Sequence, residues 1–415
     1  MTTTYVGALR CPRCQRDYSE ESAFTICPTC RDDDVSIFPK PVYDLSGRTS
    51  LPIDPAHPGI FRFSELLPVD DGAFVSLGEG NTPLLPIPEV GTQAGIESLY
   101  YKDESRNPTW SYKDRLAAVA ITKAVQVGAE TVVVSSTGNH GAAIAAFAAR
   151  AGIRCIVLTL ESVPQAMKTL MQSFGAQVFA MKQPQDRGLL MWQGVEQRGW
   201  VPMSGYPSPP SGSNPFGIDG YKTIAYELWE QTAGDLPDVI VAPVAYGDGI
   251  AGIVRGFADL IELGLADRIP RLIAAEPYGP LGVALRGGTG TERPPEPTVA
   301  FNIAAVTPTW QALNAIKVTS GSGLSATDEE TMQAQAVLGT RSGIFAEASS
   351  AITLAVLEKA RAAELVDPGE RVVLLGTSTG LKDVPTTAAR LPAVPTIEPT
   401  LDAFDRALDD REVRV

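Results

Sequence analysis

Short runs of apolar and β-branched residues alternate with stretches of helical periodicity along most of the chain. Runs typical of buried strands lie at residues 131–135, 154–159, 177–181, 238–242, 271–276 and 371–376. Between many of them, apolar residues recur at helical spacing, as at 114–127, 140–151 and 219–233. This alternation predicts an α/β fold whose parallel sheets are covered on both faces. Ligands of such folds bind where the strands end, so the strand-to-helix loops should carry the chemistry.

Length and charge narrow the class of protein. A chain of 415 residues is too long for one ordinary core, so we expect two domains and an appendage. Its net charge of −14 disfavours nucleic acid and anionic membranes as partners. No apolar run is long enough to span a bilayer, and the first residues lack a signal-peptide core. A cytoplasmic protein with reduced thiols is therefore expected.

Most of the cysteines lie near the start of the chain, as the C-x2-C pairs Cys11/Cys14 and Cys27/Cys30. Two such pairs supply four thiolates to a tetrahedral structural zinc, which a short segment with almost no other core needs in order to fold. An iron site of the same geometry and two disulfides are the alternatives, and reducing conditions disfavour the disulfides. Cys155 lies inside a strand run and is predicted to be a buried core thiol.

Lys113 stands at the start of a predicted helix. Ser111 is the expected N-cap, and Asp114 would complete a short capping box. In the first turn the helix dipole disfavours a cation, so it favours the uncharged, nucleophilic amine. Such a lysine can form a Schiff base with an aldehyde cofactor. An ordinary surface lysine at a helix start is the alternative.

The loop Ser136–Thr137–Gly138–Asn139–His140 links a strand to an alanine-rich helix. Its backbone amides at a helix N-terminus, with the hydroxyls and the amide side chain, suit a carboxylate or a phosphate. A plain tight turn is the alternative, and His140 is either a general base or a helix cap.

Two further loops follow predicted strands. In the first, Gly247 and Gly249 flank Asp248 and can form an amide nest for a phosphate, provided that the carboxylate points away. In the second, residues 377–379 are Thr-Ser-Thr, which offer neutral hydrogen bonds to a heteroaromatic ring or form a simple turn. His57 lies in a proline-rich connection at 38–60 and is expected to face solvent.

Motifs of other enzyme classes are missing from the sequence. There is no P-loop, no G-x-G-x-x-G at a strand end, no G-x-S-x-G, no H-E-x-x-H and no histidine cluster. Most kinases, dehydrogenases, hydrolases and metalloproteases are thereby excluded.

Taken together, the segments resemble the threonine synthase family of pyridoxal 5'-phosphate (PLP) enzymes, fold type II. The matching stretches, in family order, are residues 78–84, 102–104, 107–109, 111–115, 136–139, 220–223, 343–347 and 377–383. The N-terminal cysteine pairs also resemble a ribbon found in several members. The resemblance implies a tryptophan synthase β-like fold of two three-layer parallel-sheet domains, preceded by a zinc ribbon.

The resemblance also implies domain boundaries. Residues 1–45 would form the zinc ribbon and 113–215 the small α/β domain. Residues 46–112 and 216–395 would form the large PLP-binding domain, followed by a C-terminal tail at 396–415. A homodimer acting on a small amino acid is expected.

Roles for single residues follow from the same resemblance. Lys113 is expected to hold PLP covalently and then to move protons, and Asn139 is expected to bind the PLP 3-hydroxyl. Thr377 would face the pyridine nitrogen, where a neutral partner suits elimination and replacement better than transamination. The loop that binds the PLP phosphate would comprise Tyr246, Gly247, Asp248 and Gly249. The residues expected to bind substrate are Ser136, Thr137, His140 and Trp110.

The chain departs from the family mainly on the substrate side. Gly217 replaces an arginine that the family uses for the substrate's phosphate, and Trp110 stands where a glycine is usual. Val244 and Ala245 replace the first glycine and the asparagine of the usual phosphate loop.

Several functions stay open. The first is a PLP-dependent, threonine synthase-like lyase that catalyses β- or γ-elimination or replacement on a small amino acid, for which conversion of O-phosphohomoserine to threonine and phosphate is the model reaction. The second is a serine/threonine ammonia-lyase, and the third a non-catalytic PLP-fold protein whose ribbon binds a partner.

Overall fold

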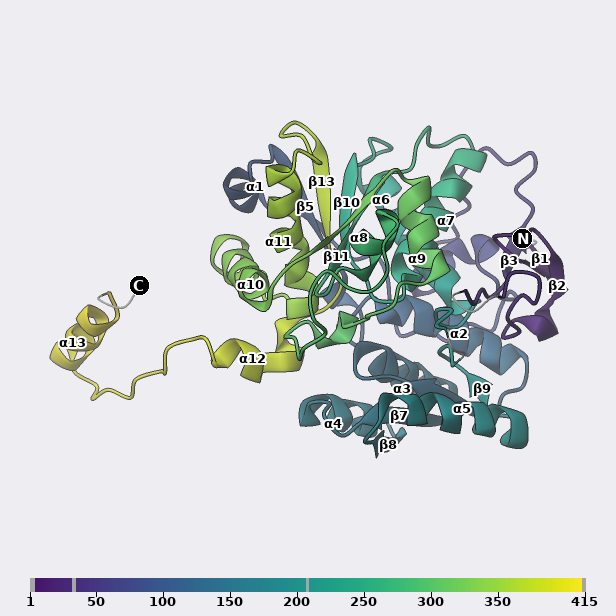
Figure 1. The fold of residues 1–415 in the computed structure, drawn as a ribbon, viewed down its shortest axis with the longest axis horizontal. Coiled ribbons are helices and arrows are strands. Elements are labelled where there is room, and N and C mark those ends of the chain that lie inside the picture. Colours follow the sequence, from purple (N-terminus) through teal and green to yellow (C-terminus); the bar gives the residue numbers. More distant parts are fainter. Residues whose placement is uncertain (1–3, 32–34, 207–208, 413–415) are drawn as a thin grey trace. The chain divides into compact units, whose positions relative to one another are not determined.

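The computed structural model describes residues 4–31, 35–206 and 209–412, and the side chains up to 408 (Figure 1). It divides into two units, the first ending at Lys382 and the second beginning at Asp383. The second unit contains the helices α12 (Val384–Ala388) and α13 (Leu401–Glu412). All sheets of the described residues lie in the first unit.

The largest sheet has the strand order β12-β11-β10-β13-β5-β4. Its strands are β4 (Leu84–Pro86), β5 (Ser98–Asp103), β10 (Val239–Pro243), β11 (Arg271–Glu276), β12 (Ser322–Ser325) and β13 (Arg371–Gly376). All neighbours pair in parallel except β4, which runs antiparallel to β5 at the edge. The carboxyl ends of the parallel strands therefore meet at one edge of the sheet.

The central strands β10, β11 and β13 of this sheet bury alternate residues in two different cores. On β10, Val239 and Val241 pack with α1 (Pro88–Ala94), α10 (Asp328–Ser342) and α11 (Ala348–Ala362). Ile240 and Ala242 of the same strand pack with α6 (Lys222–Gln231), α7 (Asp248–Glu262) and α9 (Trp310–Val318) on the other face. Figure 1 shows these two helical layers on either side of the sheet. Successive residues of a strand point to opposite faces of the sheet, and here both faces are buried. The strands therefore appear in the sequence as continuous apolar runs.

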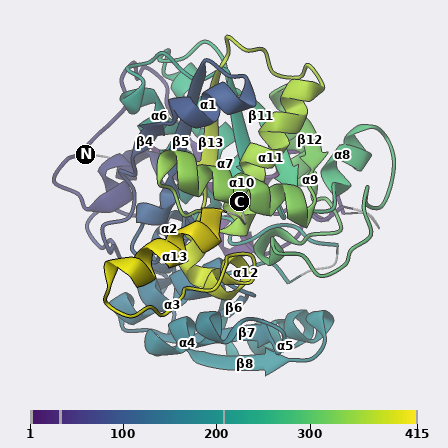
Figure 2. The same cartoon turned by 90° about the vertical axis from the view of Figure 1, so that its left-hand side faces the viewer.

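The smaller sheet has the order β8-β7-β6-β9 and is parallel throughout. Its strands are β6 (Thr131–Ser135), β7 (Arg154–Leu160), β8 (Gln177–Met181) and β9 (Val201–Pro202). The helices around it are α2 (Lys113–Gln126), α3 (Asn139–Ala151), α4 (Gln165–Ser173) and α5 (Pro184–Arg198). Val132 and Val134 join the core that also fills one face of the large sheet, whereas Val133 packs against Met191 of α5. This sheet is thus also a three-layer structure (Figure 2).

A third, antiparallel sheet precedes the other two. It consists of β1 (Tyr5–Arg10), β2 (Asp17–Ser19) and β3 (Lys40–Tyr43), in the order β2-β1-β3. Cysteines of this segment form a small cluster of buried residues. Among the described residues, Ile37 is the one other buried apolar side chain in that cluster. Such a small core cannot hold this segment by itself, as the sequence predicted.

The predicted α/β fold is confirmed, including the parallel sheets with helices on both faces. The runs at 131–135, 177–181, 271–276 and 371–376 are strands with the predicted bounds. Cys155 is buried, as expected. Among the described helices, none combines the length and the apolar character needed to cross a membrane. The proposed domain boundaries at 45, 112, 215 and 395 stay predictions.

Two parallel strands of the large sheet, β5 and β12, were not among the predicted runs, because their composition is weak. Ser98–Asp103 ends in charged residues, and Ser322–Ser325 contains glycine and two serines. Both pair with apolar neighbours that supply the packing, β13 for the first and β11 for the second. Tertiary context overrides strand propensity at such positions.

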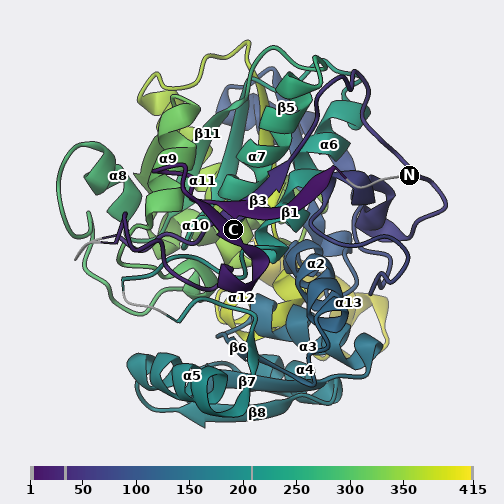
Figure 3. The same cartoon turned by 90° about the vertical axis from the view of Figure 1, so that its right-hand side faces the viewer.

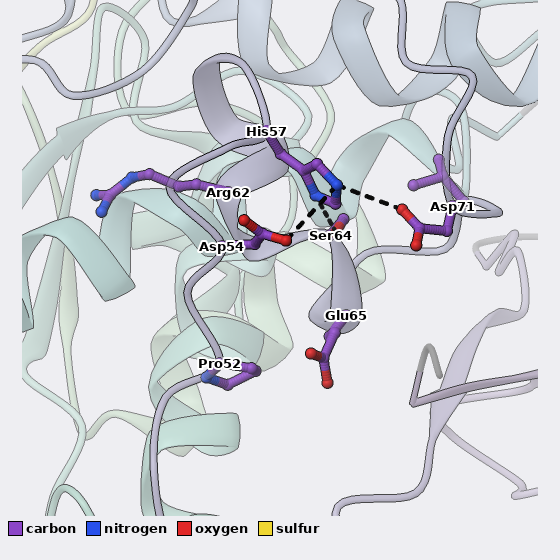
Figure 4. Close-up of a pocket in the computed structure, with 8 residues that line it drawn as sticks. Pro52, Asp54, His57, Arg62, Ser64, Glu65 and Asp71 are labelled. Atoms are coloured by element: carbon purple, nitrogen blue, oxygen red, sulfur yellow. Dashed lines mark hydrogen bonds and ion pairs between the residues drawn. The ribbon is translucent and has the colours of Figure 1, made fainter. Parts of the chain in front are cut away.

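The expectation that His57 faces solvent is wrong. Its ring is about three-quarters buried and packs edge-on against Phe74, with ring centroids 4.9 Å apart. Nδ1 lies 3.1 Å from Ser64 Oγ, and Nε2 lies 3.5 Å from Asp71 and 3.8 Å from Asp54 (Figure 4). The ring lines a small pocket of about 30 Å³, which is too small for more than a water.

Candidate active site

Lys113 is the first residue of α2, after a loop that leaves the carboxyl end of β5. Its ammonium lies 4.9 Å from the ring centroid of Tyr112 and 5.7 Å from that of Tyr221. Within the described part of the chain, no carboxylate forms an ion pair with it. The two aromatic rings and the absence of an acidic partner leave the amine free for a ligand.

The predicted capping box at the start of α2 is wrong. The helix begins later than expected, with Tyr112 as its N-cap, and Ser111 Oγ accepts a hydrogen bond from the amide of Lys113 at 3.2 Å. The carboxylate of Asp114 accepts instead from the amide of Thr109 at 2.6 Å and from its hydroxyl. Burial raises the pKa of Asp114 to about 6. Asp114 therefore fixes the loop before the helix.

A buried network of charges anchors the first turn of α2. Arg115 Nε lies 2.7 Å from Glu104, and its Nη2 lies 2.7 Å from Glu227 on α6. Lys102 of β5 also pairs with Glu227, at 2.8 Å. All four side chains are at most 1% exposed. Because a buried charge without its partner is costly, this network restrains the helix that carries Lys113.

Asn139, the first residue of α3, bonds to two charged side chains. Lys382 Nζ donates to Asn139 Oδ1 at 2.6 Å, and Asn139 Nδ2 donates to Glu347 at 3.0 Å. Asn302 Nδ2 donates to the other oxygen of Glu347 at 2.7 Å. Burial lowers the pKa of Lys382 to about 8, although Glu347 and Asp114 oppose the shift. These contacts fix the amide of Asn139 in one orientation.

Lys382, Glu347 and Asn302 had no predicted role in the site. Lys382 and Glu347 lie within the matching stretches at 377–383 and 343–347, so the resemblance marked their segments but not their contacts. Asn302 lies in a short 3₁₀ turn outside every motif. Nothing in the sequence pairs these residues with Asn139, which is more than 150 positions earlier than each of them.

The loop after β6 is folded around Ser136. The amides of Gly138 and Gly141 donate to Ser136 Oγ at 3.1 and 2.9 Å, and Thr137 is half-buried beside it. A Cβ at Gly138 would lie 2.2 Å from Asn302 Oδ1, so a larger residue there would displace the side chain of Asn302. The loop is therefore shaped by its own serine and by a close contact with Asn302.

His140 is buried, and its Nε2 has no hydrogen-bond partner within the described residues. Burial, together with the charge of nearby Lys113, lowers the pKa of His140 to about 3. The ring is therefore neutral at physiological pH and poorly suited to act as a base. An unpaired buried nitrogen beside Lys113 is an observation that a bound ligand would explain.

The loop after β10 has the shape of an anion site. Gly247 has φ of +79°, and a Cβ there would lie 2.5 Å from that of Ala312. A Cβ at Gly249 would lie 2.7 Å from Cε2 of Tyr112. Both glycines are required by close packing, and the amides of the first turn of α7 remain available, as at any helix start.

Asp248 does not face this anion site. Its carboxylate accepts from the amide and the hydroxyl of Ser213, at 2.9 and 2.7 Å, and from Gln311 Nε2 at 2.6 Å. The carboxylate of Asp248 is thus held by Ser213 and Gln311. The carbonyl oxygen of Tyr246 accepts hydrogen bonds from Thr309 Oγ1 and Gln311 Nε2. The residue itself is 45% exposed.

Thr377 is buried where β13 ends. Its hydroxyl lies 3.0 Å from that of Ser350, and its carbonyl accepts from the amide of Tyr112 at 3.0 Å. Tyr112 therefore contacts both Thr377 and Gly249, and its ring lies against Lys113. The structure thus gathers Lys113 and the loops after β10 and β13 around one tyrosine.

Trp110 lies at the outer edge of this site. It has φ of +58°, which is uncommon for a bulky residue, and its side chain is 47% exposed. Its carbonyl accepts from Ser378 Oγ at 2.9 Å. Gly217, in contrast, is buried, and a Cβ there would lie 2.9 Å from the carbonyl oxygen of Leu116. This packing leaves no space for a long side chain at 217.

The four N-terminal cysteines form one cluster. All their sulfurs lie within 4.8 Å of one another, with Cys11 3.8 Å from Cys30 and Cys14 3.6 Å from Cys27. These separations exceed the ~2.0 Å of a disulfide and match the ~3.8 Å edge of a tetrahedron with ~2.3 Å metal–sulfur bonds. The cluster can therefore hold a metal ion.

Comparison with known proteins gives a consistent result. Residues 75–378 match the family of pyridoxal-phosphate dependent enzymes. The chain is 35% identical over 362 residues to a threonine synthase of Methanocaldococcus jannaschii, covering 85% of this chain and 87% of that protein. It is 32% identical over 414 residues to a threonine synthase of Methanosarcina acetivorans, covering 96% and 98%.

Solved structures agree on the fold. A diaminopropionate ammonia lyase from Escherichia coli superimposes with a TM-score of 0.63 at 20% identity, covering 75% of this chain and 87% of that one. A serine racemase from Dictyostelium discoideum gives 0.59 at 25% identity, covering 72% and 92%.

Proposed function

Since the chain belongs to the pyridoxal-phosphate-dependent enzymes and, among them, to the threonine synthase family, we propose that Lys113 is the lysine that binds PLP. The chain is a PLP-dependent, threonine synthase-like lyase. The observation that carries the assignment of Lys113 is its amine, which lies beside the packed rings of Tyr112 and Tyr221 and has no ion pair among the described residues. The reaction we propose converts O-phosphohomoserine to threonine and phosphate.

The residues present fit the cofactor. Bound PLP supplies an electron sink for the pair left when the substrate loses its Cα proton. Lys113 is the group placed to take that proton and to return it. Asn139, oriented by Lys382 and Glu347, offers its amide to the 3-hydroxyl. Thr377, paired with Ser350, offers an uncharged hydroxyl to the ring nitrogen.

The loop of Tyr246, Gly247, Asp248 and Gly249 is proposed to bind the PLP phosphate. The support is geometric, because the glycines allow close approach and Asp248 is bonded to Ser213 and Gln311. Helix α7 then presents its N-terminal amides and the positive end of its dipole to the anion.

Ser136, Thr137, His140 and Trp110 are proposed to bind the substrate. The unpaired Nε2 of neutral His140 offers one hydrogen bond inside the site. Residue 217 cannot hold the substrate's phosphate, because the glycine is packed against Leu116. The phosphate must therefore be bound by groups other than the family arginine.

The lysine assignment can be tested without measuring activity. The PLP-loaded protein is reduced with borohydride, digested and analysed by mass spectrometry. We expect the reduced cofactor on the peptide that contains Lys113. Attachment to Lys382 or Lys222 would contradict the proposal. Lys113→Ala should lose the adduct, whereas Lys168→Ala, which changes a half-buried lysine on α4, should keep it.

The substrate can be tested with a panel of three amino acids. O-phosphohomoserine, threonine and serine are supplied separately to the PLP-loaded enzyme, and phosphate, threonine, ammonia and 2-oxo acids are measured. Equal release of phosphate and threonine from the first compound supports the proposed reaction. Ammonia and a 2-oxo acid from serine or threonine, without threonine synthesis, would instead identify an ammonia-lyase.

We also propose that the cysteine cluster holds zinc, that the enzyme is a homodimer and that it works in the cytoplasm. The sulfur–sulfur distances support a tetrahedral metal, and zinc is the usual ion of a four-thiolate structural site. Elemental analysis, light scattering of the purified enzyme and cell fractionation test the three statements separately.

A further inference from the structure

A second cavity lies outside the proposed active site, between strand β3 and the helices α7 and α9. Its volume is about 370 Å³, within the range of small-molecule sites. It is lined by residues that include Ser36, Lys40, Ser211, Arg255, Trp310 and Gln311. None of Lys113, Asn139, Gly247, Gly249 and Thr377 lines it. Figure 3 views this side of the molecule, with the purple N-terminal strands in front of α7 and α9.

Two buried hydroxyls in the wall of this cavity have no partner. Ser36 is 3% exposed and Ser211 is 5% exposed, and neither Oγ makes a hydrogen bond within the described residues. Leaving a buried hydroxyl unpaired costs free energy, so such groups are rare in native proteins. They come from segments far apart in the sequence, yet both line the same cavity.

The charges of the cavity leave one cation without a counter-charge. Asp219 is paired with Arg255 at 2.7 Å, and Asp259 is paired with Lys222 at 2.6 Å. Lys40, which is half-buried, has no ion pair or hydrogen bond among the described residues. Burial and the nearby charge of Arg255 lower the pKa of Lys40. Asp219 and Asp259 only partly oppose that shift, because each already has a cationic partner.

The other titratable groups do not neutralise Lys40. Arg10 pairs with Asp17 at 2.6 Å. The hydroxyl of Tyr43 donates to Asp219 at 2.6 Å. Glu262 lines the cavity, but it is exposed and is not among the charges that act on Lys40. The cavity therefore combines one uncompensated cation with two unused hydrogen-bond donors, which together suit an oxyanion.

We propose that this cavity is a second ligand site, which binds a small metabolite through a carboxylate or phosphate group held by Lys40, Ser36 and Ser211. The indole of Trp310 lines the same space and offers an apolar surface to the rest of the ligand. Gln311, which donates a hydrogen bond to Asp248 of the proposed PLP phosphate loop, also lines the cavity. A ligand in the cavity would thus contact a side chain that supports the loop after β10.

The test uses the PLP-loaded, full-length enzyme and calorimetric titration with inorganic phosphate and, separately, with succinate, at constant ionic strength. We expect a saturable binding event, separate from any anion binding in the active site, that Lys40→Met weakens at least tenfold. Tighter binding of phosphate than of succinate identifies a phosphate-bearing ligand, and the reverse order identifies a carboxylate. Absence of saturable binding of either anion, or equal affinity in Lys40→Met, would overturn the proposal.

The serines give a test that does not depend on folding. Because their hydroxyls make no hydrogen bond with any described residue, Ser36→Ala and Ser211→Ala should leave the melting temperature unchanged or slightly higher. Each should nevertheless weaken anion binding several-fold. The matched control is Thr159→Val, which also removes a buried, unpaired hydroxyl but lies on β7, away from the cavity. If the serine variants bind as tightly as the control, the proposal is wrong.

Discussion

Lys382 donates a 2.6 Å hydrogen bond to the side-chain oxygen of Asn139, from a position 243 residues further along the chain. Asn139 is the proposed partner of the PLP 3-hydroxyl, and Lys382 is 6% exposed. The cation therefore fixes which end of the amide faces the cofactor. With PLP bound, Lys382 would also place a positive charge close to the 3-hydroxyl that Asn139 is proposed to bind.

This buried cation should give the protein a distinct dependence of stability on pH. Its pKa is about 8 in the folded protein and near 10.5 when unfolded, so the unfolded state binds more protons between these values. Stability should therefore rise with pH from about 8 to about 10.5. Lys382→Met should lack this rise. Urea unfolding of both proteins at pH 7, 9 and 10 measures the difference, and parallel curves would contradict the assignment.

Glu227 is the shared partner of Arg115 and Lys102, and all three are buried. Glu227→Gln would leave two buried cations with only Glu104 nearby. We expect a loss of about 3–5 kcal/mol in the free energy of unfolding. The control is Glu196→Gln, which changes an exposed residue on α5 and should shift stability by at most about 0.5 kcal/mol. Denaturant titration compares the two, and similar losses would show that the network adds little.

Gly217 is packed so closely against α2 that even a methyl group should be unfavourable. A Cβ there would lie 2.9 Å from Leu116 O and 3.0 Å from the Cβ of Ala120. Gly217→Ala should therefore destabilise the protein by about 1–3 kcal/mol. Gly339→Ala provides a matched comparison, because that helical glycine has open space around it. This variant should be more stable than the unchanged protein by about 0.5–1 kcal/mol. Equal melting temperatures of the two variants would refute the packing argument.

The chain has two histidines, so proton NMR can follow each one. The pKa of His140 is lowered to about 3 by burial and by Lys113. Its ring signals should stay constant between pH 5 and 8, both with and without PLP. His140→Asn identifies the signal by removing it. Titration of that signal near neutral pH would show that the ring is charged and would restore it as a candidate base.

Removal of the metal should unfold the N-terminal sheet selectively. A strong chelator, or Cys14→Ser, should remove about one equivalent of bound metal. The melting temperature should then fall, because few buried apolar side chains surround the cysteines and could hold this segment without the metal. Cys155→Ser should keep the metal, since Cys155 lies on β7 outside the cluster. Elemental analysis and calorimetry measure both effects. Full metal content in Cys14→Ser would contradict four-cysteine ligation.

Local pattern was enough to determine the main elements of this protein. The strand runs, the helices between them and the cysteine pairs depend on periodicity and spacing, which are properties of neighbouring residues. The placement of chemistry in the loops after strands followed from the topology of parallel sheets. The matched motifs extended this to a family and to named residues such as Lys113.

Tertiary structure decided the contacts between distant residues. The capping box predicted for Asp114 was wrong because the buried loop at Thr109 competes for its carboxylate. The partners of Asn139, the direction of the Asp248 carboxylate and the crowding at Gly217 all depend on segments far away in the sequence. Burial decides the protonation of His140 and Lys382, and burial is a property of the assembled fold. The sequence by itself therefore predicted the site at the strand ends, and the packing of these distant segments decided the geometry and charge of the residues proposed to form it.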